Sequence, residues 1–184
     1  MKTQQQTLSG VKFQTPEEIM ASMPYPELTT CDGEPNYKLL VTIRNEIKEN
    51  YASIPSVAGG GDNGYLGGIM ANAAYATVCA TAFAVPDDPG AFTIEAGKTV
   101  VDSNNQNRTY TENKRCYQEW QSPERACKNQ IIKLIPKECM AEKANNHRVF
   151  AGVRAREILE HLFTIYGEIR AQGLVANRVK MGEE

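Results

Sequence analysis

Apolar residues recur at helical spacing in two parts of the chain. In the first, Leu39, Ile43, Ile47 and Tyr51 follow one another every four residues, with Leu40 beside them. This spacing puts them on one face of an α-helix, which we expect to begin at Pro35. Pro55 and the glycines that follow it should end this helix.

The second part lies near the end of the chain and predicts a helix over residues 153–166. Ile158, Leu162 and Ile165 share one face there, with Leu159 and Tyr166 beside them. Gly167 follows directly, and we expect it to end the helix in the left-handed conformation. A last amphipathic piece is expected over residues 174–181.

Between these parts the pattern predicts shorter or more polar elements. A short buried helix is expected near residues 69–80, and a turn over 86–90, where proline, aspartate and glycine cluster. A polar helix should run from about Lys98 to Trp120. Ser122 is a favourable cap and is followed by proline, so it predicts a new helix that continues to Pro136. A short helix over 137–144 should complete this part.

The sequence therefore predicts an all-α protein, a multi-helix bundle with a flexible N-terminal arm and a Gly-rich loop. The arm covers residues 1–27 and includes one short helical turn near Pro16; the helical domain covers 28–184. Of all residues, 41% are hydrophobic and 23% charged, which is ordinary for a folded domain. No apolar run reaches the roughly 18 residues of a membrane helix, so we expect a cytoplasmic protein without membrane contact.

Charge is distributed unevenly along the chain. Residues 1–107 hold 6 Lys/Arg and 12 Asp/Glu, a balance of -6, whereas residues 108–184 hold 14 and 10, a balance of +4. Lys128, Lys133 and Lys137 form a candidate basic edge in the positive part, which could face RNA or be ordinarily solvated.

Residues that usually carry chemistry are not arranged for it. The five cysteines include no Cys-x-x-Cys pair, and neither histidine stands at zinc-ligand spacing from a cysteine. We therefore expect no catalytic, metal or cofactor site. Gly59, Gly61 and Gly64 match the glycine pattern of dinucleotide-binding loops, but a helical segment precedes them where that motif needs a strand. We favour a flexible or tightly turned loop over residues 59–68, in which glycine is needed at positive φ.

Two groups of residues resemble the Gag protein of copia-type retrotransposons. In the first, a glycine is followed by Asn-Tyr and an amphipathic helix; in the second, a spaced Trp-Ala-Ile pattern precedes an Ala-x-Glu-Ile helix. The residues at these positions are Gly33, Tyr37, Trp120, Ala126, Ile131, Leu134, Ala155, Ile158, Leu162 and Tyr166. Residues 55–67 are similar to Gag-like reading frames of diatoms and other algae. The zinc knuckle of that family is not present in this sequence.

The resemblance implies a capsid-type structural protein rather than an enzyme. Such a protein would self-associate into virus-like particles and package its RNA, with other copies of itself and RNA as partners and no small-molecule substrate. These residues would then represent one lobe of a longer capsid protein. The alternative is a helical nucleic-acid-binding or adaptor module that does not assemble.

Overall fold

The computed structural model describes residues 14–56, 60–94, 97–144 and 150–167. Within these ranges every regular element is a helix, which confirms the predicted all-α class. The elements are α1 (Pro16–Ser22), α2 (Tyr37–Ser53), the 3-10 helices η1 (Gly61–Asn63) and η2 (Leu66–Gly68), α3 (Asn72–Tyr75), α4 (Val100–Leu134), the 3-10 helix η3 (Lys137–Lys143) and α5 (Ala155–Tyr166).

Helix α2 forms where the apolar spacing predicts it. The Asn36 side chain caps its start by accepting a hydrogen bond from the Leu39 N–H at 3.0 Å. Leu40, Ile43 and Ile47 are fully buried. Tyr51 is also buried, whereas Leu39 is only partly buried, so in the first turn Leu40 takes the core position that was expected for Leu39.

Helix α5 also matches its prediction, apart from its end. The Glu157 carboxylate accepts a hydrogen bond from the Arg154 N–H at 2.9 Å and so closes the first turn. Ile165, expected on the buried face, is 43% exposed. Gly167 has φ -81°, which is right-handed, so the predicted left-handed cap is wrong.

Residues 100–134 form one continuous helix, α4, and the predicted helix start at Ser122 is wrong. Pro123 lies inside this helix, where a proline removes one backbone hydrogen bond and costs about 3 kcal/mol. Trp120, Pro123 and Cys127 are spaced by three and four residues, and all are buried on the same face. Since the buried residues before and after Pro123 lie on the same face of the helix, their packing offsets the lost hydrogen bond.

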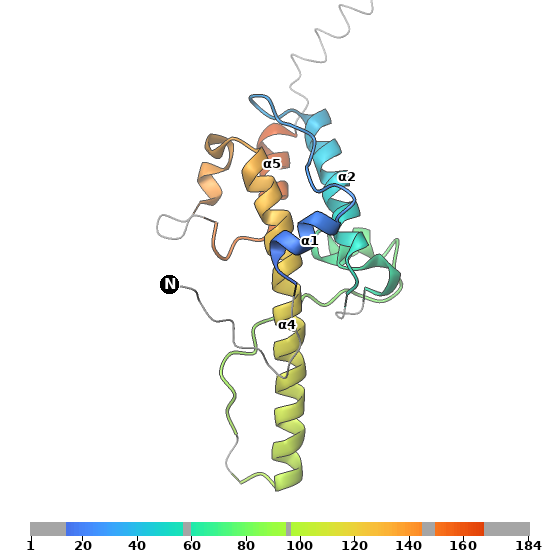
Figure 1. The fold of residues 1–184 in the computed structure, drawn as a ribbon, viewed down its shortest axis with the longest axis vertical. Coiled ribbons are helices and arrows are strands. Elements are labelled where there is room, and N and C mark those ends of the chain that lie inside the picture. Colours follow the sequence, from blue (N-terminus) through green and yellow to red (C-terminus); the bar gives the residue numbers. More distant parts are fainter. Residues whose placement is uncertain (1–13, 57–59, 95–96, 145–149, 168–184) are drawn as a thin grey trace, which may run out of the picture.

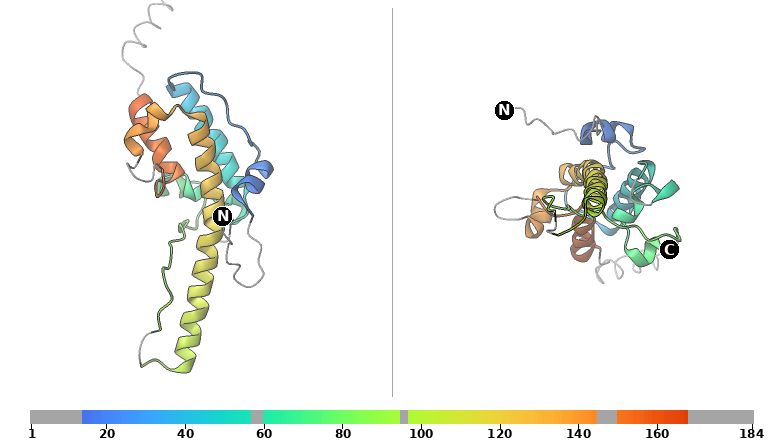
Figure 2. Two further views of the ribbon diagram at one scale, coloured as in Figure 1. Left: turned by 60° about the vertical axis from the view of Figure 1, so that its left-hand side comes forward. Right: turned by 90° about the horizontal axis from the view of Figure 1, so that it is seen from below.

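Helix α4 divides into two parts with different surroundings. All of its buried residues lie between Trp120 and Ile131. This half packs against α2 and α5, whereas the half that begins at Val100 projects away from the bundle (Figure 1). The view along the axis in Figure 2 shows the other elements gathered around α4. The molecule is therefore a helical bundle with one helix extended beyond it.

Residues 14–27 pack on the bundle instead of forming part of an arm. Ile19 and Met23 belong to the core, and α1 contacts α4. The Tyr25 backbone is held by the buried Asn50 side chain, which accepts from the Tyr25 N–H at 2.9 Å and donates to its carbonyl at 2.8 Å. Gln130 of α4 donates to the same carbonyl. Of the expected arm, residues 1–13 lie outside the described part of the chain.

Three further expectations need correction or lie outside the described residues. The helix predicted near 69–80 is reduced to α3, the four residues Asn72–Tyr75, of which Tyr75 is buried. The backbone turn predicted at 86–90 does not form; the Asp88 carboxylate instead accepts from the Gly90 N–H at 3.0 Å, and the segment runs beside α4 (Figure 1). The short helix near 137–144 is present as η3. The amphipathic piece at 174–181 lies outside the described residues.

No helix in the described ranges is long and apolar enough to cross a membrane.

Candidate functional site

The residues that carry the family resemblance mostly meet in one core. Trp120, Ala126, Ile131, Ala155, Ile158 and Leu162 are buried, and Leu134 and Tyr166 pack partly buried against them. Gly33 and Tyr37 differ. Gly33 has φ +92° in the loop before α2, and Tyr37 is 45% exposed. The Tyr37 and Phe163 rings meet edge to face with 6.3 Å between centroids, which links the start of α2 to the last turn of α5.

Trp120 is the centre of an aromatic cluster. Its ring lies 5.5 Å from Tyr65 and 6.1 Å from both Tyr51 and Phe83, measured between centroids. Tyr75 packs on Phe83 from the outer side at 6.1 Å. These separations are in the range of favourable aromatic pairs. Trp120, which is 4% exposed, is therefore a core residue.

The glycine-rich loop closes over this cluster. A Cβ atom at Gly67 would lie 2.2 Å from Phe83, and one at Gly68 would lie 2.3 Å from Trp120. Gly64 has φ +52°, and a Cβ there would collide with the carbonyl oxygens at the end of α2. The Tyr65 N–H donates to one of them, the Tyr51 carbonyl, at 2.9 Å. The glycines thus permit close backbone approach.

This placement does not suit a phosphate-binding loop. Dinucleotide pyrophosphates are bound by N–H groups at a helix N-terminus. Here the described part of the loop lies against the C-terminal carbonyls of α2. Those oxygens would repel a phosphate at this position. Of the glycines that match the dinucleotide pattern, Gly64 is explained by close packing and Gly61 by its φ of +52°, while Gly59 lies outside the described residues.

Glu124 is a buried carboxylate with a structural role. One oxygen accepts a hydrogen bond from the Tyr51 hydroxyl at 2.6 Å, and the other accepts from the Ala155 N–H at 2.7 Å. It therefore links α4 to α2 and to the first turn of α5, where a negative charge is favourable. Burial, and next the charge of Glu124, raise the pKa of Tyr51 well above its ordinary value. Sequence spacing gives no signal for this three-way contact.

The three lysines of the predicted basic edge do not lie on one edge. The half-buried Lys128 donates from Nζ to the Phe150 carbonyl at 3.3 Å and to the Val153 carbonyl at 3.1 Å. Lys133 and Lys137 are exposed. Five residues of helix correspond to a rotation of about 140°, so Lys128 and Lys133 point in different directions. Lys128 serves to hold the segment before α5, and the edge as predicted is wrong.

The projecting half of α4 is accompanied by a segment that we call the strap, residues 86–92. Phe92 packs on Tyr110 with 5.0 Å between ring centroids, and the Tyr110 hydroxyl donates to the Gly90 carbonyl at 3.0 Å. The Lys114 ammonium pairs with Asp88 at 2.9 Å. That hydrogen bond, and then one from the Gly90 N–H, lower the pKa of Asp88.

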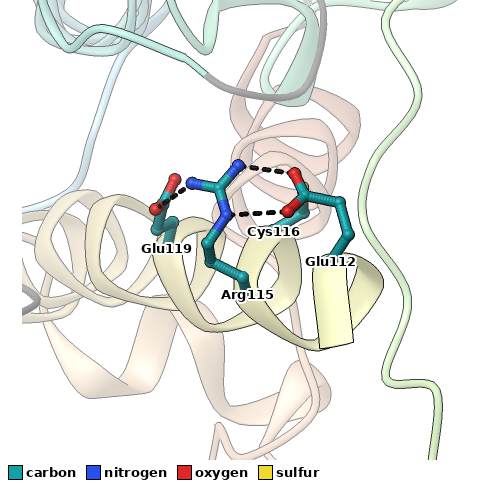
Figure 3. Close-up of polar contacts among 4 residues, drawn as sticks. All are labelled: Glu112, Arg115, Cys116 and Glu119. Atoms are coloured by element: carbon teal, nitrogen blue, oxygen red, sulfur yellow. Dashed lines mark hydrogen bonds and ion pairs between the residues drawn. The ribbon is translucent and has the colours of Figure 1, made fainter. Parts of the chain in front are cut away.

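Ion pairs along the helix surface support the base of the projection. Arg115 donates two hydrogen bonds to the Glu112 carboxylate and one to Glu119, at 2.6 Å (Figure 3). Its hydrogen bonds are the main reason why the pKa of Glu112 lies below the ordinary value. Each such exposed pair contributes only tenths of a kcal/mol. Nearby Cys116 is a poor nucleophile, because burial and Glu112 raise its pKa.

The far end of the projection exposes apolar side chains. Ile94 is 64% exposed, Val100 78% and Val101 69%. Thr99 caps the helix there by accepting from the Asp102 N–H at 3.2 Å. The helix end is thus well formed, while its valines have little contact within the molecule.

The described residues include no cluster of three or more His, Cys, Asp or Glu side chains that could hold a metal ion. The buried Cys127 has its pKa raised well above the ordinary value by burial and by Glu124, which makes it unreactive.

Comparison of the chain with protein-family models, with curated proteins and with solved structures found no match. The described part of the chain is an all-α bundle with a packed aromatic core and one projecting helix, whose far end exposes apolar side chains.

Proposed function

We propose that this chain is a non-enzymatic structural protein of the Gag type, which self-associates in the cytoplasm into particles that package RNA. The observation that supports self-association best is the apolar end of the projection. Val100 and Val101 stand at the start of a capped helix and are more than two thirds exposed. A second copy of the chain would remove this apolar surface from water, which is worth about 25 cal/mol per Å².

The composition of the projecting half supports the same proposal. Residues 103–113 include several Asn, Ser and Thr residues, which are weaker helix formers than Ala or Leu. The twenty residues before Trp120 would extend about 30 Å as a helix, and none of them is buried. An exposed helix of this length is marginal without packing. Contact with another copy would supply that packing.

Light scattering and electron microscopy of the purified protein test the proposal. We expect multimers that grow with protein concentration, and a shift to monomer in the Val100→Glu/Val101→Glu variant. Val78→Glu is the matched control, because Val78 is 51% exposed but lies outside the projection. A wild-type chain that stays monomeric at high concentration, with or without RNA, would contradict self-association. Equal dissociation by the control variant would contradict the assigned surface.

A second candidate function is nucleic-acid binding without assembly. It is favoured by a group of cations in a cavity between α2 and α5, described below. A salt titration distinguishes the two functions, because RNA binding weakens steeply with salt whereas apolar self-association does not.

A further inference from the structure

A cavity of about 400 Å³ lies between α2, α5 and the segment 69–74. Its charged lining residues are Arg44 and Lys48 from α2, with Arg156 and Glu160 from α5. Three positive charges and one negative charge leave a balance of +2. Ile69, Leu159 and Phe163 are among the apolar residues of the wall. The cavity thus combines cations with an apolar surface.

Arg156 is held in a fixed position at this cavity. Its Nε donates to the Glu160 carboxylate at 2.6 Å, and Nη1 donates to the Met70 carbonyl at 3.0 Å. These bonds tie α5 to the segment 69–74. Among the described residues they leave Nη2 without a hydrogen-bond acceptor, so this nitrogen remains a donor for a ligand. A donor that is already positioned loses little entropy when it binds.

Arg44 is positioned by an aromatic ring. Its guanidinium lies over Phe163, 4.5 Å from the ring centroid. Its Nε is buried and has no hydrogen-bond acceptor within the described part of the chain. A buried donor without an acceptor costs free energy, which a ligand oxygen would recover.

Lys48 adds a further positive charge to the lining of the cavity. It follows Arg44 by four residues on the same helix, where like charges repel. Burial, and next the charge of Arg44, lower the pKa of Lys48. No ion pair of Lys48 occurs in the described ranges. Among the described residues, neither of the two cations on α2 pairs with an acidic side chain that would relieve their repulsion.

We propose that this cavity binds the phosphate group of a nucleotide, with oxygens on Arg44, Lys48 and Arg156 and the organic part against Ile69 and Leu159. Its volume lies in the range of small-molecule sites, about 300–1,000 Å³, and exceeds what a bare phosphate would fill. Arginine and lysine are the common phosphate-binding side chains. The nucleotide is either free or a unit of single-stranded RNA, and both present the same group. This inference does not rest on self-association.

Backbone amide spectra recorded by NMR test this site with adenosine 5′-monophosphate as the probe. We expect saturable shifts of resonances in residues 69–74 and 156–164, and none with adenosine, which lacks the phosphate. The Arg44→Gln/Lys48→Gln variant should raise Kd by more than about tenfold, because two charge-assisted hydrogen bonds are lost. The Lys133→Gln/Lys137→Gln variant removes the same charge elsewhere and should keep the affinity. Circular dichroism checks that both variants fold.

Anisotropy with a short oligouridine identifies the source of the phosphate. If RNA supplies it, the Arg44→Gln/Lys48→Gln variant should reduce the slope of log K against log salt by about 1.4, or roughly 0.7 per contact. If free nucleotide supplies it, the same variant should lose binding of the monophosphate and keep the salt dependence of oligouridine binding unchanged. The proposal is overturned if the monophosphate causes no saturable shift at these residues, or if the control variant weakens binding equally. Neither result bears on the light-scattering test of self-association.

Discussion

Gly68→Ala is expected to destabilise the protein by forcing the glycine loop and Trp120 apart. Gly68 does not have a positive φ, so alanine is compatible with its backbone, and the effect is purely steric. The added Cβ would lie 2.3 Å from Cη2 and 2.7 Å from Cζ3 of the indole, whereas ordinary contact begins at 3.4 Å. The loop or the indole must therefore move by more than 1 Å.

The indole cannot move freely, since rings pack on it from several sides. Tyr51, Tyr65 and Phe83 each lie within 6.1 Å of it, between centroids. Overpacking of this kind costs about 1–3 kcal/mol. Trp120→Phe removes the outer ring of the indole, including Cη2 and Cζ3, and so creates the space that a methyl group at position 68 needs. The double variant should be more stable than the sum of the two single effects predicts, by about 0.5–3 kcal/mol.

Urea unfolding followed by far-ultraviolet circular dichroism measures each variant of this cycle. Fluorescence is unsuitable, because Trp120 is the single tryptophan. Gly33→Ala is the control: Gly33 has no atom near its Cβ position, and its φ of +92° makes alanine unfavourable for backbone reasons alone. Its effect should add to that of Trp120→Phe within about 0.5 kcal/mol. A neutral Gly68→Ala, or a coupling energy no larger than that of the control, would refute the proposed contact.

Two further outcomes are expected. Glu124→Ala removes the acceptor of both the Tyr51 hydroxyl and the Ala155 N–H and should cost about 3–5 kcal/mol, while Tyr51→Phe removes only one of these bonds and should cost less. Equal losses in urea unfolding would show that the bond to Ala155 contributes nothing. The pKa of Asp88 is lowered in the folded state, so its bond to Lys114 stabilises the strap above the unfolded pKa and is lost as pH falls through the folded value. Hydrogen exchange of residues 86–92 should therefore accelerate, relative to the core, only in acid, and an unchanged profile would disprove the role of this pair.

Local patterning predicted the elements whose buried stripes are long. Helices α2 and α5 were identified because their apolar residues repeat at helical spacing and point into the core. The boundary at Ser122 was predicted wrongly, because serine followed by proline is a strong local start signal. Only the shared burial of Trp120, Pro123 and Cys127 shows that one helix continues through this point.

The candidate sites were less accessible to sequence reasoning. Lys128, Lys133 and Lys137 were grouped by spacing, yet Lys128 is used to bind backbone carbonyls. The spacing of Arg44 and Lys48 on α2 was a usable signal that two cations share a face. Their approach to Arg156 could not be predicted, because it requires contact between segments more than 100 residues apart.

The sequence by itself determined the helical class and the two main amphipathic helices, since each depends on the period of apolar residues along a short stretch. Tertiary structure alone decided the continuity of α4, the bonds of Glu124 to Tyr51 and Ala155, and the cation-lined cavity between α2 and α5. The physical reason is the distance along the chain between interacting residues. Helix periodicity is a property of neighbouring residues, whereas the partners of a buried charge are set by how distant segments pack together.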